Sequence, residues 1–276
     1  MKRLFRDPVF IAGAFLVACA AFAAVFAPVL TSWDPIAVDI GREHPLPPGG
    51  EHLLGTDDVG RDVFARILYG ARLSLAVGLS ARLLSTAIGV GLGLAAGFFR
   101  GLTETIVMRA TDLLLAFPSL LLLIAVAAAF GGSLAAVFLT IGLAGWGGMA
   151  RLVRAQVLTI REEEYVMAAR AAGVPDARLV LRHILPNCSG PIIASFTVGV
   201  ASAILAEASL SFLGLGAQEP SPSWGNMAHL GTLRLLSAPW LALAPASAIA
   251  IVVLGWNFVG DALESALAPG AARVSG

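Results

Sequence analysis

The chain has 276 residues, of which 58% are hydrophobic and only 13% are charged. That is too little charge to cover a soluble globule of this size, so the composition excludes an ordinary soluble domain and indicates an integral membrane protein. Eighteen basic and eighteen acidic residues balance to a net charge of zero, which gives no electrostatic footprint for nucleic acid.

Lysine and cysteine usage narrows the chemistry further. Lys2 is the only lysine of the sequence, so a P-loop lysine is lacking and a self-contained Walker-type ATPase is excluded. If ATP drives this protein, another subunit has to hydrolyse it. Cys19 and Cys188 lie far apart, and the four histidines form no ligand-spaced cluster, so we expect neither a disulfide nor a metal site.

Six apolar stretches are long enough to cross a bilayer, which takes about 20 residues per helix. In chain order they are residues 9–30, 73–99, 106–130, 134–152, 190–213 and 241–263. The first has a basic start and small residues, so a cleaved signal peptide is the alternative. Its long apolar run and the five spans that follow favour a retained anchor. The predicted fold class is all-α, a polytopic membrane protein with six transmembrane helices.

The positions of the basic residues set the predicted orientation, because positive residues are retained on the cytoplasmic side of a membrane. With the N-terminus inside, the inner segments carry Lys2, Arg3, Arg6, Arg100, Arg109, Arg151, Arg154, Arg161, Arg170, Arg178, Arg182 and Arg273. The outer segments carry fewer, namely Arg42, Arg61, Arg66, Arg72 and Arg234. Both termini are therefore predicted to be cytoplasmic.

Two polar segments, residues 31–70 and 216–239, are predicted on the outer side. Their prolines and glycines favour ordered loops with short helices, and a plain connecting loop is the alternative. The charged residues of "GTDDVGRDVF" form either a local network or a surface that meets a partner, and "PSWGN" lies on the other segment. The docking candidates of the two segments are Asp57, Asp58, Arg61, Asp62 and Trp224.

Two ionisable residues lie well inside the predicted spans, where charge is costly. Glu207 either belongs to a translocation path or makes a tertiary or inter-subunit hydrogen bond. Arg82 snorkels to the interface, pairs with Glu207 or lines the path. The same span carries glycines at 89, 91, 93 and 97, a stripe that favours tight helix packing over pore lining. Pro118 and Pro245 predict kinks, which serve either as hinges or as static packing features.

A charged stretch, "REEEYVMAARAAGVPDARLVLRHILPN" at residues 161–187, interrupts this apolar chain. Its pattern predicts a helix over 162–172, with Gly173 as the C-cap. Pro175 begins a second short helix and Pro186 stops it. The first helix places four residues with mostly small side chains on one face, Tyr165, Ala168, Ala169 and Ala172. Two short helices joined at a glycine bend form either a docking element or a solvated loop.

"AARAAG", followed at a fixed distance by "ILP", resembles the EAA loop of binding-protein-dependent ABC transporter permeases. Further motifs are similar to those of the C-type permease of dipeptide and oligopeptide importers. They are "HLLGTDDVGRDVFARILYGARLSL", "ARLVRAQVL", "EASLSFLGLG", "PSPSWGNM", "SAPWLALAP" and "NFVGDAL". They cover nearly the whole chain in order, so the resemblance is specific.

The resemblance implies a type I ABC importer permease fold in the inner membrane, forming half of a pathway for dipeptides or oligopeptides. The implied partners are a homologous B-type permease, two ABC ATPase subunits and an extracytoplasmic substrate-binding protein. No cofactor is implied in this chain, because ATP and Mg²⁺ are bound by the ATPase subunits. The chain itself is then a transport subunit and not an enzyme.

The resemblance also implies that residues 155–187 couple the permease to its ATPases. Five residues fall on positions of the family motif, Ala168, Ala169, Gly173, Leu185 and Pro186. Glu164, Tyr165, Met167 and Arg170 lie beside them in the same loop. Met167 departs from the pattern, because it stands where the family has a glutamate. Glu164 or its acidic neighbours at 162 and 163 then supply acidity one turn earlier.

The predicted organisation is an N-terminal helix with its outer segment over residues 1–69 and a permease core with five spans over 70–276. Two other functions fit the sequence poorly. An ion-coupled secondary transporter needs more ionisable groups at mid-membrane than the spans offer, and an intramembrane enzyme lacks a recognisable catalytic motif. Within the family, a nickel complex or another small solute is the alternative substrate.

Overall fold

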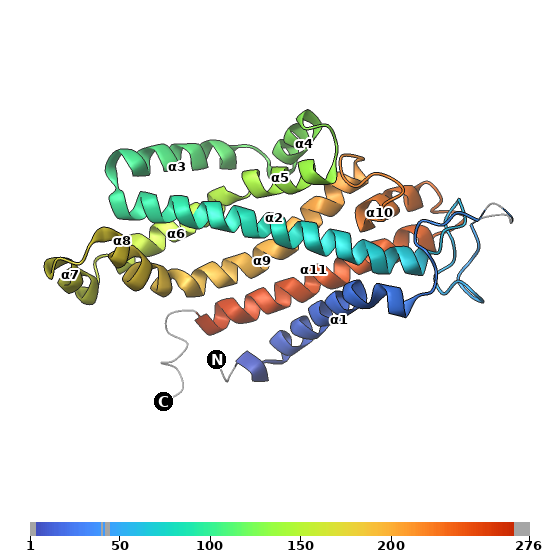
Figure 1. The fold of residues 1–276 in the computed structure, drawn as a ribbon, viewed down its shortest axis with the longest axis horizontal. Helices are drawn as coiled ribbons and strands as arrows, with labels where there is room; N and C mark the ends of the chain where they lie inside the picture. Colours follow the sequence, from blue (N-terminus) through green and yellow to red (C-terminus); the bar gives the residue numbers. More distant parts are fainter. Residues whose placement is uncertain (1–3, 40, 42–44, 268–276) are drawn as a thin grey trace.

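The computed structural model describes residues 4–39, 41 and 45–267. Over these residues the regular structure is helical, with two isolated β-bridges and no strand, which confirms the predicted all-α class. The long helices run side by side in an elongated bundle (Figure 1). In chain order the elements are the 3₁₀-helix η1 (Leu4–Arg6), α1 (Pro8–Leu30), α2 (Val63–Phe99), α3 (Gly101–Ala116), α4 (Ser119–Ala129), α5 (Leu134–Ala144), α6 (Trp146–Ile160), α7 (Glu164–Ala171), α8 (Asp176–Leu179), the π-helix η2 (Val180–Ile184), α9 (Leu185–Phe212), α10 (Trp224–Thr232) and α11 (Trp240–Leu267).

Five helical stretches are long and apolar enough to cross a membrane by themselves, Pro8–Leu30, Val63–Phe99, Leu134–Ile160, Asp176–Phe212 and Trp240–Leu267. A sixth span is obtained only if α3 and α4 are counted together, and these two helices meet at an angle of 95°. The expectation of a continuous third span over 106–130 is therefore wrong. The number of spans is still six if α3 and α4 together form one of them.

The break between α3 and α4 follows from Pro118. Proline has no backbone N–H to donate to the preceding turn, and it disfavours helical backbone at the residue before it. Phe117 is accordingly extended, with φ −87° and ψ 141°, and α4 begins directly after Pro118. The kink expected from the sequence is present, but it is large enough to separate two helices.

The span formed by α2 begins earlier than its apolar stretch predicted. α2 begins at Val63 because Asp62 caps it, accepting a hydrogen bond from the Ala65 N–H at 2.6 Å. Its first turns carry polar side chains that are satisfied by other parts of the protein, so hydropathy alone placed the start ten residues too late. The predicted boundary at residues 69 and 70 lies within this helix, and the division into 1–69 and 70–276 stays a prediction.

α2 lies at the centre of the bundle and packs most extensively against α6. A Cβ at Gly89, Gly93 or Gly97 would lie 2.6 to 2.7 Å from side-chain atoms of Met149, Val153 or Val157. The helices come close because these positions carry no side chain. Gly91 differs, because no heavy atom lies within 4 Å of a Cβ built there. The small-residue stripe is thus a packing surface at 89, 93 and 97, and at Gly91 it is open.

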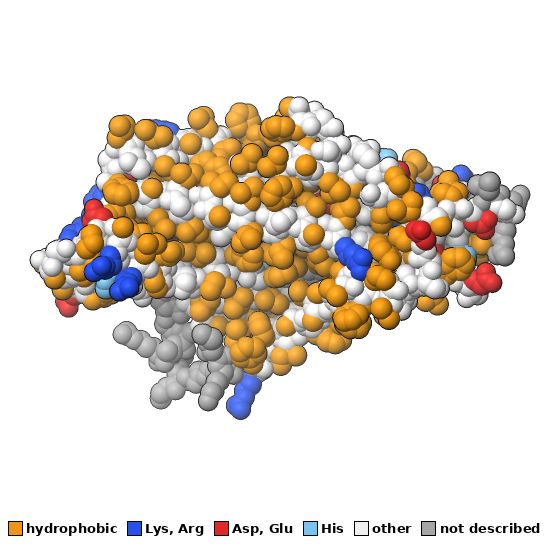
Figure 2. All heavy atoms as spheres, viewed as in Figure 1, with side chains coloured by type: hydrophobic (Ala, Val, Ile, Leu, Met, Phe, Trp, Pro, Cys, Tyr) orange, Lys and Arg blue, Asp and Glu red, His pale blue; other side chains and the backbone are white. Residues whose placement is uncertain are grey.

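The two ends of the bundle differ from its middle in chemistry. On the face shown in Figure 2, hydrophobic side chains cover the middle, and most charged side chains lie toward the ends of the long axis. The start of α1 and the end of α11 lie toward the end that carries α7 and α8 (Figure 1). The described ends of the chain and the predicted coupling loop are therefore on one side of the apolar belt. Lys2, Arg3, Arg42 and Arg273, used to predict the orientation, lie outside the described residues.

Arg72 compensates for a proline inside α1. Pro28 has no N–H, so the Ala24 carbonyl loses its helical donor. The Arg72 Nε donates to that carbonyl from α2, and Nη2 donates to the Val25 carbonyl at 2.9 Å. Arg72 thereby joins the last turns of α1 to the beginning of α2.

We expect Arg72→Met to destabilise the purified chain by about 1 kcal/mol, since a net hydrogen bond is worth about that much. In a thermal-shift measurement in detergent this corresponds to a decrease in Tm of about 2 to 4 °C. The matched control is Arg109→Met, because Arg109 is exposed on α3 and has no hydrogen-bond partner among the described residues. Equal effects of both substitutions would show that the contact with α1 contributes nothing.

Candidate functional site

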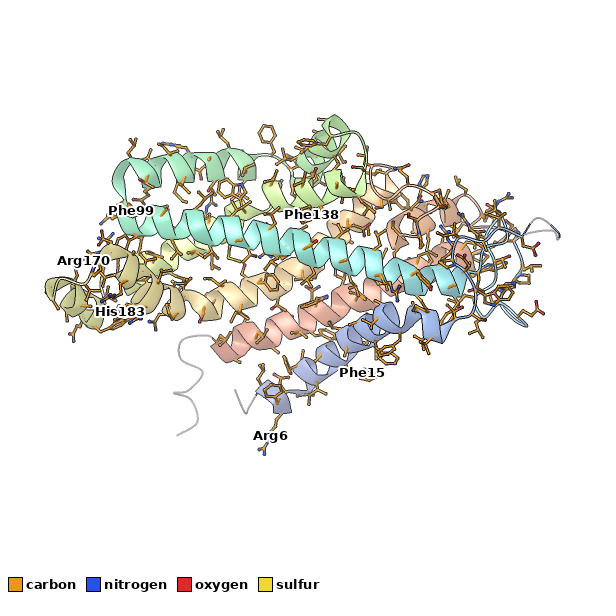
Figure 3. All side chains as sticks on the ribbon, in the orientation of Figure 1. Arg6, Phe15, Phe99, Phe138, Arg170 and His183 are labelled. Atoms are coloured by element: carbon orange, nitrogen blue, oxygen red, sulfur yellow. The ribbon has the colours of Figure 1, made fainter. Side chains whose placement is uncertain are left out.

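The predicted coupling loop extends from one end of the bundle as the element formed by α7 and α8 (Figure 1). Arg170 lies in α7 and His183 in η2, which follows α8, and both are near the end of α2 that carries Phe99 (Figure 3). α7 begins after Glu163 and carries Glu164 in its first turn and Arg170 in its last, an arrangement that suits the helix dipole. A short charged helix is thus held away from the apolar belt.

Gly173 makes the bend that the sequence predicted. Its φ of +79° is a left-handed conformation that L-residues other than glycine adopt only under strain. The Gly173 N–H donates to the Arg170 carbonyl at 3.0 Å, and the Val174 N–H donates to the Ala169 carbonyl at 3.2 Å. These two bonds form a Schellman motif, which ends α7 and fixes the direction of the chain into α8.

α7 packs on the bundle through one face and exposes the other. Val166 is 1% exposed and belongs to a core cluster with Phe98 and Leu179, against which Ala169 also packs. The Arg170 guanidinium lies over the Phe98 ring, 5.3 Å from its centroid. The expectation that Ala169 shares an outward face is therefore wrong, because it lies one turn from Val166 on the buried side.

The outward face of α7 consists of Glu164, Tyr165, Met167 and Ala168, and Arg170 lies at its edge, exposed and against the Phe98 ring. Met167 is 49% exposed, so the position at which the family motif has its glutamate is open to a partner. Partial desolvation and the nearby Glu163 carboxylate raise the pKa of Tyr165 above its ordinary value, which already leaves a phenol neutral at physiological pH. The face is therefore mixed, with an acid, a base, a phenol and two small or flexible apolar side chains.

The prediction that Pro186 stops the second helix is wrong. α8 continues through η2 into α9, and the whole stretch Asp176–Phe212 is one long helical span. The Leu185 N–H donates to the Val180 carbonyl, five residues back, which widens the turn just before the proline. A π-turn at this point accommodates a ring that would clash with an ordinary α-helical turn. Leu185 and Pro186 thus lie at the base of the loop and not at its tip.

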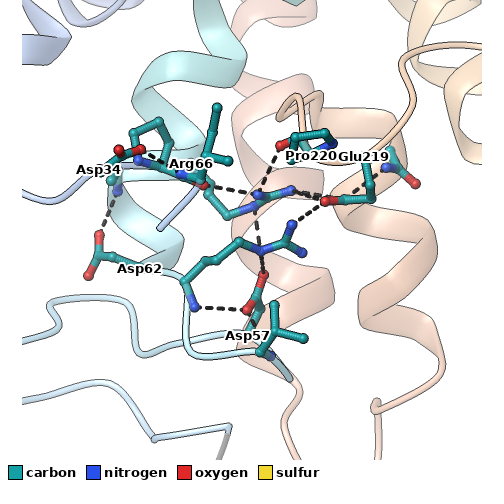
Figure 4. Close-up of polar contacts among 12 residues, drawn as sticks. Asp34, Asp57, Asp62, Arg66, Glu219 and Pro220 are labelled. Carbon is teal, nitrogen blue, oxygen red and sulfur yellow. Dashed lines mark hydrogen bonds and ion pairs between the residues drawn. The ribbon is translucent and has the colours of Figure 1, made fainter. Parts of the chain in front are cut away.

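A network of charges joins the two outer segments (Figure 4). The Arg61 Nε lies 2.7 Å from Asp57 Oδ2, and Arg61 also pairs with Glu219. The Arg66 Nη2 lies 2.9 Å from Glu219 Oε1, and its Nη1 donates to the Pro35 carbonyl at 3.0 Å. Both arginines are buried, so the network fastens the segment before α2 to the segment after α9.

The other outer candidates are placed less favourably for a partner. Asp62 is buried, where it caps α2 and lies 2.8 Å from His52 Nδ1. Trp224 is 2% exposed, and its indole N–H donates to the Ile67 carbonyl at 3.0 Å. The expectation of Trp224 as a docking residue is therefore wrong, since the side chain packs inside the protein. Asp58 is exposed and pairs with Arg234 at 3.0 Å.

Sequence reasoning missed Arg66 and Glu219 as members of this network. The sequence does contain a pattern that could have indicated them. Glu219 is the only acid between residues 216 and 239, and it lies shortly after the end of an apolar span. A lone acid in one outer segment and two arginines in the other are a plausible pair once both segments are known to lie on one side.

The structure separates the two predicted path residues. Glu207 is fully buried and accepts a hydrogen bond from the Ser211 hydroxyl at 2.8 Å, and no cation pairs with it among the described residues. It lies inside this chain and lines none of the described cavities, so the path role expected for Glu207 is not supported by its position. The bond to Ser211 lies within α9, four residues along the same helix, so the alternative of a tertiary or inter-subunit hydrogen bond stays a prediction. Arg82 instead donates to α9 backbone, at 2.6 Å to the Ser195 carbonyl, and lines two cavities.

Two family models match most of the chain. One, described as a binding-protein-dependent transport system inner membrane component, matches residues 89–273. The chain belongs to this family of transport permeases. A second model, described as the N-terminal TM domain of oligopeptide transport permease C, matches residues 1–48. The permease is thus an inner-membrane transport subunit of the ABC class and not itself an enzyme, and its family works with ATPase and substrate-binding partners and a second permease.

Curated relatives and solved structures agree with this assignment. The permease is 44% identical to the dipeptide transport system permease protein DppC of Alkalihalophilus pseudofirmus, over 97% of this chain and 88% of that protein. It is 39% identical to the oligopeptide transport system permease protein OppC of Bacillus subtilis, over 98% and 88%. A chain of the methionine ABC transporter MetNI, in an inward-facing conformation, superposes with a TM-score of 0.60 at 18% identity and covers 74% of this chain and 97% of its own length. That likeness establishes the type I importer permease fold.

Proposed function

We propose that this permease is the C-type subunit of an ATP-driven importer of dipeptides and oligopeptides. The observation that carries the proposal is the match over nearly the whole chain to proteins named as peptide permeases, at 44% identity to one and 39% to another. A further relative, the glutathione transport system permease protein GsiD of Pectobacterium atrosepticum, is 42% identical over 80% of this chain. Glutathione is itself a small peptide, so the relatives agree in substrate class.

The proposed assembly contains a homologous B-type permease, two ABC ATPase subunits and an extracytoplasmic substrate-binding protein. ATP and Mg²⁺ bind to the ATPase subunits, since the only lysine of this chain lies at residue 2 and not in a P-loop. The end with α7 and α8 faces the cytoplasm with both termini, in keeping with the excess of arginines there. The opposite end, with Asp57 and Asp58 at its surface, meets the substrate-binding protein.

In this proposal α7 is the element that docks on an ATPase subunit. Its exposed face offers Tyr165, Met167 and Ala168, and through Val166 and Ala169 its buried face belongs to a core cluster with residues of α2, α6, α8 and α9. A displacement of α7 is then passed to α2 and α9 through packed side chains, because a close-packed interface transmits movement. The glutamate of the family motif is absent at Met167, so packing by Ala168 and Met167 carries the contact in place of an ion pair.

We expect Met167→Glu to leave ATP-driven uptake within about twofold of the unmodified level, because substitutions at exposed positions usually change stability by less than about 0.5 kcal/mol. Val166→Glu is the matched control. It introduces the same side chain at the neighbouring position, which is buried in the core, and we expect uptake to be lost. Severe loss of uptake in Met167→Glu, measured in reconstituted complex, would contradict this placement of the motif.

The substrate class is tested by isolating the complex together with its binding protein and identifying the retained ligand by mass spectrometry. The proposal expects a peptide with a free α-carboxylate. A nickel chelate, a sugar or another non-peptide solute in that position would contradict the peptide assignment and leave the permease role in place.

A further inference from the structure

Arg82 is a cation near the middle of a long membrane helix. α2 has 37 residues, and at 1.5 Å per residue Arg82 is about 28 Å from its start and about 26 Å from its end. Among the residues that the structure describes, no carboxylate pairs with Arg82. Its guanidinium is held instead by neutral groups of α9, the Ser195 carbonyl at 2.6 Å, the Ser195 hydroxyl at 3.3 Å and the Phe196 carbonyl at 3.4 Å.

The guanidinium of Arg82 fits against α9 because residue 199 is a glycine. Arg82 lies directly over Gly199 of α9, and a Cβ at that position would collide with the guanidinium. The contacts with α9 use Nε and Nη2, and no hydrogen-bond partner of Nη1 occurs among the described residues. An arginine has five N–H donors, so this arrangement fixes the charge in place and leaves donors unused.

Two cavities meet at Arg82. The first, of about 600 Å³, extends from Arg82 to Gln156 and Glu264 near the inner end of the bundle. The second, of about 500 Å³, extends along α4, α5 and α9 as far as Ala206, toward the outer end. Arg82, Gly145 and Gly199 line both.

The two cavities are open at the surface of this chain. The second exposes Phe117 and Ser202, and Gly145 is exposed where the two cavities join. A second permease placed against this side would close them into a continuous passage. Arg82 would then be the charged point in the wall at the middle of that passage.

An unpaired cation at this depth has a cost that calls for an anionic complement. Charged side chains within membrane helices are costly, and they mark the pathways of substrates and ions. Peptides of any sequence share one anionic group, the α-carboxylate, and a guanidinium binds a carboxylate with charge-assisted hydrogen bonds. A single arginine can therefore bind the α-carboxylate that all peptides share, without contacting the side chains that differ between them.

We propose that Arg82 binds the carboxylate of the solute as it passes between the two cavities. This inference rests on the proposed function, since it takes the passing solute to be a peptide. The competing role is purely structural: Arg82 would brace α2 against α9 through the Ser195 and Phe196 carbonyls and meet no solute. The two roles differ in whether charge is needed and whether water-borne anions reach the site.

The first experiment measures ATP-driven uptake of dialanine by the complete complex in proteoliposomes. We expect Arg82→Gln to lower the uptake rate by about tenfold or more, because a charge-assisted bond is lost. Arg82→Lys, which keeps the charge, is expected to retain more uptake than Arg82→Gln. The matched control is Arg151→Gln, because Arg151 is half exposed, pairs with Asp112 and lines neither cavity.

The second experiment needs no transport. In a Cys19→Ser background, Ser202→Cys places a thiol in the outer cavity, while Cys188 is buried and serves as the measured background. The complete complex is labelled with 2-sulfonatoethyl methanethiosulfonate and, separately, with its trimethylammonium counterpart. We expect the anionic reagent to react several-fold faster relative to the cationic one when Arg82 is present, and this preference to disappear in Arg82→Gln.

The outcomes separate the two proposals. Absence of dialanine uptake by the unmodified complex would contradict the proposed function. Normal uptake by that complex, together with an unchanged rate in Arg82→Gln or an equal preference for the two reagents with and without Arg82, would overturn the role of Arg82 alone. A similar loss of uptake in Arg82→Lys and Arg82→Gln, with unchanged labelling preference, would assign Arg82 to the structural role.

Discussion

Gly173→Pro is expected to lower ATP-driven uptake by about a hundredfold or more while the complex still assembles. Proline fixes φ near −65°, whereas Gly173 has a φ of +79°, and the substitution also removes the N–H that bonds the Arg170 carbonyl. The cost of about 3 kcal/mol or more corresponds to roughly a hundredfold loss of the native bend. α7 would then leave its packing on α2 and α9, and movement of an ATPase subunit would no longer reach the spans.

Gly173→Asn is the matched substitution, because asparagine tolerates left-handed backbone better than other non-glycine residues. No heavy atom lies within 4 Å of a Cβ at this position, so the side chain itself meets no obstacle. We expect uptake of Gly173→Asn to stay within a few-fold of the unmodified level. Co-purification of the ATPase subunits reports assembly in both variants. Full uptake by Gly173→Pro, with assembly intact, would contradict the coupling role of this bend.

Gly93→Val is expected to destabilise the isolated permease by about 1 to 3 kcal/mol or more, as insertion of side-chain volume into a closely packed interface does. A Cβ at Gly93 would lie 2.7 Å from both the Ala150 carbonyl oxygen and the Val153 Cβ. Backbone cannot rotate away as a side chain can, so α2 and α6 have to separate. The measurement is thermal unfolding of the purified chain in detergent, together with its yield in the membrane.

Gly91→Val is the control for this prediction. It makes the same substitution two residues away in the same helix, so the loss of helix propensity is equal. The position is open, and we expect the Tm to stay close to that of the unmodified chain. If both variants lost the same stability, the close approach of α2 to α6 at Gly93 would not be what holds the two helices together.

Much of the fold followed from composition and local pattern. Apolar length placed α1 and α11 within a few residues of their observed bounds, because α1 carries no charged residue and α11 carries its two, Asp261 and Glu264, only near its end. Glycine punctuation predicted the bend at Gly173, since only its backbone enters the left-handed region at no cost. The ordered motifs led to the family, which matching relatives then established.

The parts that were missed depend on contacts between distant segments. The start of α2 was hidden because Arg66 is charged, and only its pairing with Glu219, far along the chain, explains how it can be buried. The helix continues through Pro186 by way of a π-turn, and no sequence pattern predicts such a turn. The size of the break at Pro118 depends on what α3 and α4 pack against, and a proline alone predicts a kink without its angle.

The candidate sites also divide into features that local sequence predicts and features that depend on contacts between distant segments. Exposure of Met167 on α7 agrees with a docking face, whereas Ala169 was assigned to that face by spacing and is in fact packed against the core. Trp224 belonged to a conspicuous outer motif, yet its side chain is used to close the core. For Arg82 the sequence left three roles open, and its bonds to α9 exclude pairing with Glu207 within this chain.

The proposed permease moves peptides by ATP hydrolysis in partner subunits, and uptake of dialanine tests this. Proteoliposomes would hold the complete complex, with loaded binding protein on the outer side. We expect uptake only when ATP and Mg²⁺ are present on the side of α7 and α8, and no change when ion gradients are collapsed. Uptake driven by an ion gradient without ATP, or by the permease without ATPase subunits, would contradict it.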